Sequence, residues 1–223
     1  PDLPALLVLC AMALAVALLW SFASQQDREF ARASRQLVEN AVEARRAALA
    51  DITIDYANWD AAVAATSGPL NRDWLDENYY SSVLDAIVVF RSGELRYSWT
   101  AESLEGESHL LVETVLHSAI DTPDLAGLAA APDIADSVVG TVTLLDGRLA
   151  MIAVAPITRE DEALRLTSAS SGRPLDFIAT LQVLDRDELE TMGANLGLNH
   201  LEIVPADASP RRSEVTTPIA DSS

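Results

Sequence analysis

The stretch that decides the fold is LDAIVVFRSGELRYSW, at residues 84–99. Residues 84–90 form a mostly apolar run rich in β-branched side chains, which is typical of a buried strand. The next four residues, RSGE, contain the glycine that a tight hairpin turn favours. Residues 95–99 then alternate apolar and polar side chains, as a half-buried strand does. The stretch therefore predicts an antiparallel β-hairpin.

Further strands and helices follow this hairpin. A second hairpin is predicted from residues 138–144 and 149–157 around the turn Asp146-Gly147, with two more strands at 175–184 and 198–204. Helical spacing marks residues 109–120 and 187–195, whereas 121–136 and 159–173 have the composition of connecting loops. Hairpins separated by helices predict an α+β fold, an antiparallel sheet with helices on one side.

A long helix is predicted before the sheet, over residues 25–66. It contains no Gly or Pro and stops at Thr66-Ser67-Gly68-Pro69. Apolar residues recur in it at spacings of three and four, and Arg45 alone interrupts this seam: Val38, Val42, Leu49, Ile52, Tyr56, Trp59 and Val63. Two compatible interpretations remain open. The seam packs on its own domain, or its membrane-proximal part pairs with a second protomer as a coiled coil.

The N-terminus carries the longest apolar run. Residues 3–22 contain no charge, and only Pro4 and Ser21 are not apolar. A helix of about 20 apolar residues spans the hydrocarbon core of a bilayer. A cleavable signal peptide is the competing interpretation, but its apolar region is shorter, and this one continues directly into a helical pattern. The run predicts an uncleaved transmembrane anchor at residues 1–24.

Composition excludes several classes of function. The chain has 223 residues with 15 basic and 34 acidic side chains, a formal net charge of −19. A nucleic-acid partner is not expected, because neutralising phosphates needs a clustered cationic face. A single cysteine and three histidines supply no zinc spacing, so no metal or other cofactor is expected. Phosphate-loop, metalloprotease and nucleophile-elbow motifs are also absent from the sequence, which argues against an enzyme.

Carboxylates and aromatic residues gather near the end of the long helix. Asp55, Tyr56, Trp59 and Asp60 lie within two helical turns, and Trp74 follows after the Gly-Pro break. Two interpretations remain open for this group. The indoles pack in the core while a carboxylate caps a neighbouring element, or indoles and carboxylates together line a pocket for a small cationic or polar ligand.

The run Asp55-Tyr56-Ala57-Asn58-Trp59-Asp60, followed by Trp74, by Glu77-Asn78 and by the strand at 84–90, resembles a known family. It is similar to the CHASE sensor domain of the fourth type, an extracellular sensory module of bacterial and archaeal membrane receptors. The positions that match the family pattern are Asp55, Tyr56, Ala57, Trp59, Asp60, Trp74, Asn78 and Gly93. Weaker likenesses lie at residues 146–149, 155–157 and 184–185, and the resemblance covers about residues 27–204.

The resemblance implies a Cache- or PAS-like fold in which the long helix lies along an antiparallel sheet. It divides the chain into an anchor (1–24), a signalling helix (25–66), a sensor body (67–204) and a polar segment (205–223) leading to a second membrane span. It implies a homodimer in the cytoplasmic membrane, with its body in the periplasm or outside the cell. It also implies an unknown small-molecule ligand and a cytoplasmic output domain that turns over cyclic-di-GMP or is a histidine kinase. The alternative is a membrane-tethered binding or scaffold protein without signalling output.

Overall fold

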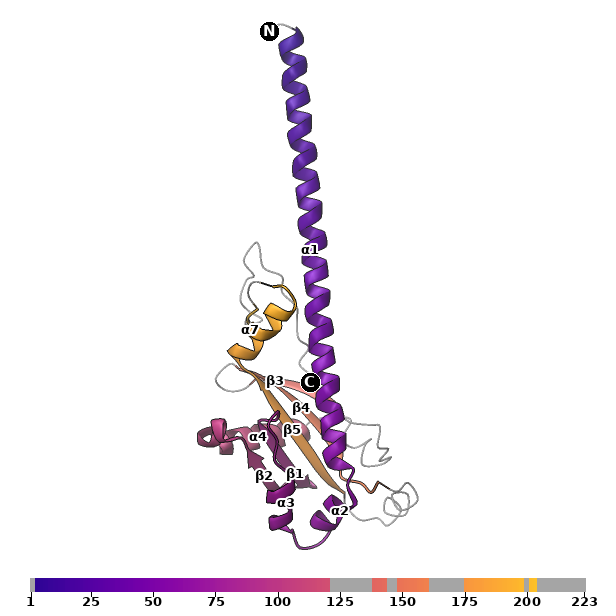
Figure 1. Ribbon diagram of the computed structural model, residues 1–223, viewed down its shortest axis with the longest axis vertical. Coiled ribbons are helices and arrows are strands. Elements are labelled where there is room, and N and C mark those ends of the chain that lie inside the picture. The colour runs from indigo at the N-terminus through magenta and orange to yellow at the C-terminus, as the bar shows by residue number, and fades with distance from the viewer. Residues whose placement is uncertain (1–2, 121–137, 144–147, 161–174, 199–200, 204–223) are drawn as a thin grey trace.

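The long N-terminal helix dominates the molecule (Figure 1). The computed structural model describes residues 3–120, 138–143, 148–160, 175–198 and 201–203. Helix α1 (Leu3–Ala57) has 55 residues, about 82 Å at 1.5 Å per residue. Its N-terminal half projects away from the sheet, and its C-terminal half lies along it. In the described part of the chain, no helix is both long and apolar enough to cross a membrane, so the predicted span at 1–24 is not confirmed.

The predicted helix over 25–66 is broken near its end. Helix α1 ends at Ala57 and a separate helix, α2 (Asp60–Thr66), begins three residues later. Trp59 between them is extended, with φ −120° and ψ 129°. The carbonyl of Ala57 accepts a hydrogen bond from Thr158 N–H at 3.1 Å. This tertiary partner and the packing of Trp59 stop the helix where the sequence shows neither Gly nor Pro.

The sheet is antiparallel and has the strand order β2-β1-β5-β4-β3 within the described residues. Its strands are β1 (Ala86–Arg91), β2 (Glu94–Thr100), β3 (Val138–Thr143), β4 (Leu149–Pro156) and β5 (Asp176–Leu184). The first hairpin is confirmed. Its turn places both Ser92 and Gly93 at positive φ, 51° and 81°, as a two-residue hairpin turn of type I′ requires.

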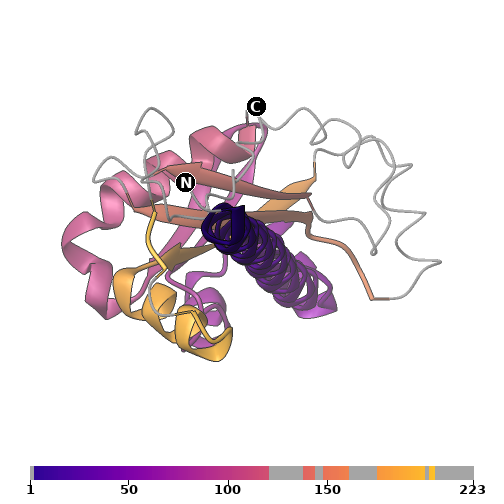
Figure 2. The same ribbon diagram turned by 90° about the horizontal axis from the view of Figure 1, so that it is seen from above.

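Both faces of the sheet are covered, which corrects the prediction of helices on one side (Figure 2). Helices α1, α2 and α3 (Arg72–Asn78) pack on one face, and helix α4 (Ser108–Ile120) packs on the other. On the first face Leu49, Leu75 and Ile87 share one core, and on the second Leu111 and Phe90 share another. Strands β4 and β5 read as apolar runs because they lie between these two layers.

The apolar seam of α1 packs on its own domain. Leu49 is 2% exposed, and Val42 and Ile52 pack partly buried against the same core. The interpretation that the seam packs on its own domain is therefore confirmed. Phe30 and Leu37, by contrast, are 67% and 45% exposed.

The remaining elements differ from the sequence predictions in detail. A 3₁₀ helix, η1 (Glu102–Glu107), precedes α4, and α7 (Arg186–Asn195) begins at the N-cap Asp185. The predicted strand at 198–204 is wrong in its described part, since 201–203 form no strand. Leu201 lies against Gly193 of α7 and Ile203 packs on the α1-side core, so these residues cover existing elements instead of extending the sheet. The predicted loops and tail at 121–136, 161–173 and 205–223 and the turn at 146–147 lie outside the described residues.

Candidate functional site

An aromatic cluster joins the end of α1 to the elements that follow it. It consists of Tyr56 in the last turn of α1, Trp59 at the N-cap of α2, Trp74 in α3, Tyr79 after α3 and Tyr97 in β2. Ring centroids are 5.8 Å apart for Tyr56–Trp59, 6.0 Å for Trp59–Trp74 and 5.6 Å for Trp74–Tyr79. These distances lie in the range of favourable edge-to-face contacts, about 4.5–7 Å. The cluster is therefore one continuous network.

Burial differs within the cluster. Tyr79 is fully buried at 0% exposure and contacts both Tyr56, at 5.7 Å, and Tyr97, at 6.3 Å. Trp59 and Trp74 are only partly buried. The buried rings of Tyr79 and Tyr97 thus form the inner part of the cluster, and the partly buried indoles of Trp59 and Trp74 form its outer part.

Hydrogen bonds tie the same cluster to the backbone of α1. The last carbonyls of a helix have no partner inside it and need one elsewhere. The Tyr56 carbonyl accepts a hydrogen bond from Tyr79 Oη at 3.1 Å, and the Tyr56 Oη in turn donates to the carbonyl of Tyr80 at 2.6 Å. Any displacement of Tyr79 therefore acts directly on the last turn of α1.

The buried phenol groups of Tyr79 and Tyr97 remain protonated hydrogen-bond donors near neutral pH. Burial raises the pKa of Tyr79 well above its usual range, and the nearby Asp176 carboxylate adds to this. Burial also raises the pKa of Tyr97, and the hydrogen bond to Asp76 contributes. Such groups position neighbours by hydrogen bonding and supply no nucleophile.

The structure brings some of the sequence-predicted residues together and leaves others apart. Tyr56, Trp59 and Trp74 meet in the cluster. Asn78 is used within its own helix, because its Nδ2 donates to the Trp74 carbonyl at 2.8 Å. Asp55 and Asp60 are both exposed. Asp60 opens α2, where the helix dipole favours a negative charge.

Three residues of the site were not predicted from the sequence. Tyr79 and Tyr97 are aromatic positions on different elements, and only the tertiary fold brings them together. Asn58 sits in the break between α1 and α2, and its Oδ1 is buried without a hydrogen-bond partner among the described residues. Its place inside the aromatic and acidic run was the one signal in the sequence that pointed to it.

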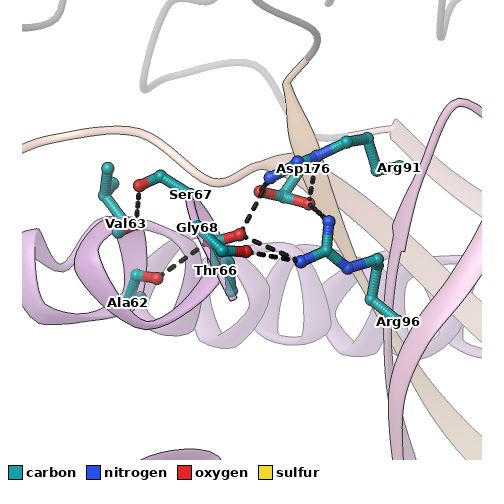
Figure 3. Close-up of polar contacts among 8 residues, drawn as sticks. All are labelled: Ala62, Val63, Thr66, Ser67, Gly68, Arg91, Arg96 and Asp176. Atoms are coloured by element: carbon teal, nitrogen blue, oxygen red, sulfur yellow. Dashed lines mark hydrogen bonds and ion pairs between the residues drawn. The ribbon is translucent and has the colours of Figure 1, made fainter. Parts of the chain in front are cut away.

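A charged clamp holds the far end of α2 (Figure 3). Asp176 at the start of β5 is 6% exposed and binds Arg91 through both carboxylate oxygens, one of them at 2.9 Å from Nε. Arg91 Nη2 also donates to the Thr66 carbonyl at 2.8 Å, and Arg96 Nη2 donates to the Gly68 carbonyl at 3.1 Å. Cations at a helix C-terminus satisfy its unpaired carbonyls and complement its dipole.

A β-bulge directs the second arginine of this clamp. The register of β1 and β2 shifts between Val89, which pairs with Tyr97, and Phe90, which pairs with Leu95. Arg96 is the extra residue, and a bulge of this kind re-aims a side chain. The sequence shows both arginines and the strand at 175–184, but neither the bulge nor the pairing of β5 with β1, so the clamp was not predictable from it.

Comparison with known proteins identifies one family. A family model described as the CHASE4 domain matches residues 41–204. The match includes the end of α1, the aromatic cluster, the clamp and the described strands of the sheet. No curated protein matches the chain.

Proposed function

The chain belongs to the CHASE4 family, and we propose that it senses a small ligand at the aromatic cluster and passes the signal to the membrane through α1. CHASE4 domains are extracellular, noncatalytic sensory domains of signalling receptors. One observation carries the proposal of the site. The family's aromatic and acidic run lies at the C-terminal end of α1, where Tyr79 hydrogen-bonds the helix backbone and two indoles remain partly open to solvent.

The chemistry of the cluster favours a small cation with N–H donors. Trp59 and Trp74 offer ring faces, and indole faces attract ammonium and guanidinium groups. The buried Asn58 Oδ1 is an acceptor that a ligand donor would satisfy. Asp55 and Asp60, both exposed on either side of the α1–α2 break, add negative charge nearby. This supports the second interpretation of the sequence motif, in which indoles and carboxylates line a pocket for a small ligand.

Transmission would use the long helix. A ligand that binds one arrangement of the cluster better than another shifts the population of states, typically by a coupling of about 1–3 kcal/mol. Movement of Tyr79 would be passed to the last turn of α1 and along the helix towards residues 1–24. The proposed membrane anchor rests on the uncharged apolar run at 3–22. The domain division becomes anchor (1–24), signalling helix (25 to Ala57) and sensor body to about residue 204.

A homodimer is part of this proposal, with α1 as its contact. The sheet side of α1 is occupied by its own domain, so a second protomer would meet the opposite face, which exposes Phe30, Leu37 and Ala44. These three residues recur every seven positions, as in a coiled coil. Cysteines placed singly at them, after removal of Cys10, should crosslink in membranes. Cysteines at Val42 or Leu49 should not, and equal crosslinking at all five would contradict this face.

Further proposals concern the receptor as a whole. Three features follow the family's architecture: the periplasmic placement of the body, a second membrane span beyond the polar segment 205–223, and an output domain for cyclic-di-GMP turnover or histidine kinase activity. A tethered binding or scaffold protein without output is the second candidate. The gene sequence after Ser223 separates the two, because a receptor requires another span and an output domain.

The ligand proposal is tested by thermal shift of the full chain in detergent. The probes are arginine, putrescine and methylammonium, which are small cations with N–H donors, and the controls are acetate, an anion, and glucose, which is neutral. A ligand at about 100 times its Kd stabilises a protein by about 2.7 kcal/mol, which raises the Tm of a domain of this size by about 5–10 °C. We expect such a rise with at least one cationic probe.

A matched pair of variants decides whether the cluster is responsible. Trp59→Ala should abolish the ligand-induced rise, whereas Trp99→Ala should keep it. Both indoles are partly buried and pack on the same core, but Trp99 has no ring contact with the cluster among the described residues. A rise that persists in Trp59→Ala would contradict the site. An unfolded Trp59→Ala chain beside a folded Trp99→Ala chain would support the purely structural interpretation of Trp59.

A further inference from the structure

A polar contact joins α1 to α7, a short helix to one side of α1 (Figure 1). Arg45 Nη2 donates to Glu188 Oε1 at 2.5 Å, and the two side chains are 26% and 29% exposed. The second oxygen of Glu188, Oε2, is buried and has no hydrogen-bond partner among the described residues. The carboxylate is thus only half satisfied, although Arg45 sits directly on it.

Further charged groups face Glu188 from each neighbouring element. Asp185 caps α7 and accepts the Glu188 N–H at 2.8 Å. Asp85, just before β1, lies near both of these carboxylates, and Arg148, just before β4, lies near Asp85. Glu188 is thus coupled to one guanidinium, that of Arg45, and to two further carboxylates, Asp185 and Asp85, while Arg148 is also paired with Glu107.

Acidic excess and burial act against the ionised form of this cluster. Asp85 has a backbone partner, since its Oδ2 accepts the Val183 N–H at 2.7 Å, but burial still raises its pKa. Burial also raises the pKa of Glu188; Arg45 works against this rise, and Asp185 and Asp85 add to it. The pairing with Arg45 does not fully compensate for desolvation and like charge. Glu188 therefore takes up a proton at a higher pH than an ordinary glutamate.

We propose that the cluster of Glu188, Asp85 and Asp185 around Arg45 is a proton-operated latch between α1 and α7. When one proton binds the free oxygen of Glu188, the carboxylate becomes a neutral acid. The neutral acid no longer suffers the desolvation of a buried charge or the repulsion from Asp185 and Asp85. Because the closed contact binds this proton more tightly than a solvated glutamate does, proton uptake favours the closed latch and proton release favours its opening. The latch lies about 16 Å along α1 from Tyr56, so it biases the signalling helix without touching the proposed ligand site and does not depend on it.

The latch is tested by the distance between the two helices. Spin labels are placed at Ala48 on α1 and Ala194 on α7, both exposed, in the full chain with Cys10→Ala, reconstituted in nanodiscs. The distance distribution is measured by pulsed EPR between about pH 8 and about pH 4.5, a range that lies above the ordinary pKa of glutamate, about 4.3, and therefore covers a raised one. We expect a longer, broader distribution at the alkaline end, where Glu188 is ionised, and one short, narrow distribution on acidification.

Two variants separate the latch from general effects of pH. Glu188→Gln, which mimics the neutral acid, should show the short, narrow distribution already at the alkaline end, with no further change on acidification. Glu190→Gln breaks the Arg186–Glu190 pair on the same helix, whose side chains are 83% and 53% exposed, and should behave as the wild type. A single proton changes the ratio of the two populations by at most tenfold per pH unit. A steeper transition would show that Asp85 is protonated together with Glu188.

The proposal is overturned if the wild-type distribution does not change with pH. It is also overturned if Glu188→Gln keeps the wild-type response. Because the wild-type titration alone decides the first outcome, the test holds even if a variant folds poorly. Far-UV circular dichroism recorded at each pH excludes unfolding as the cause of a longer distance.

Discussion

Replacing Asp176 by asparagine tests whether the charged clamp holds the end of α2 in place. Asp176→Asn keeps the size of the side chain and removes its charge. The carboxylate is 6% exposed, and Arg91 and Arg96 are each 21% exposed, so the substitution leaves two largely buried cations without a counter-ion. The Arg96 Nη1 lies 3.9 Å from the carboxylate and is the weaker of the two partners.

The size of the effect follows from this burial. Removing one partner of a buried ion pair costs about 3–5 kcal/mol. Because about a fifth of each arginine still reaches solvent, we expect the lower end of this range, a loss of about 3 kcal/mol in the free energy of unfolding. For a chain of this size the Tm should then fall by about 6–12 °C. The control is Glu39→Gln, which removes an exposed pair with Arg35 and should cost less than about 1 kcal/mol.

Urea unfolding followed by circular dichroism measures the global loss, and hydrogen exchange measures the local one. Arg91 and Arg96 are the donors that hold the Thr66 and Gly68 carbonyls, so the end of α2 should open first. The N–H of Asn71, bonded to the Ala65 carbonyl at 3.0 Å, should exchange faster in Asp176→Asn. A loss no larger than that of Glu39→Gln, with unchanged exchange at Asn71, would refute the clamp.

Three further predictions concern the core, the α1–sheet contact and pH. Leu75→Ala, at a fully buried position, should lower the free energy of unfolding by about 2–5 kcal/mol in urea titration; a smaller loss would mean that α3 is not part of the core. Thr53 gives its hydroxyl proton to the Leu49 carbonyl, so Thr180 donates to Thr53 Oγ1, and Thr53→Val should cost about 1–3 kcal/mol by leaving that buried donor unpaired; a neutral effect would contradict this assignment. Because burial raises the pKa of Glu188 in the folded state, the folded chain binds this proton more readily than the unfolded chain, and stability falls as pH rises through that pKa. Glu188→Gln should flatten this part of the pH profile of unfolding, and an unchanged slope would count against it.

Local patterns predicted the elements whose partners are near in sequence. The first hairpin is an example, because the apolar run, the Ser92-Gly93 turn and the alternating second strand are all visible within sixteen residues. The helix predicted at 187–195 is another, since α7 (Arg186–Asn195) follows the N-cap Asp185, whose side chain accepts the Glu188 N–H. In both cases the hydrogen-bond partners are neighbours along the chain, so propensity and tertiary structure agree.

The errors arose where distant residues decide local structure. The break after Ala57 depends on Thr158, about a hundred residues away, and no helix-breaking residue marks it. The second covered face was overlooked although its signal was present. Strand β4 is apolar at nearly every position, which predicts burial on both sides and not the alternation of a half-covered sheet. The charged clamp needs the order of the strands, because Asp176 of β5 meets Arg91 only through the β1–β5 pairing.

Arg45 shows how a departure from a pattern can carry more information than the pattern. In the sequence it is the one charge in the apolar seam of α1, and a charge there weakens the coiled-coil interpretation. In the structure the seam faces the sheet, and the Arg45 guanidinium is hydrogen-bonded to Glu188 of α7. The desolvation of this pair is not repaid by good geometry, since one carboxylate oxygen has no partner. A contact that adds little stability is suited to a role in which it must open, because opening it then costs little.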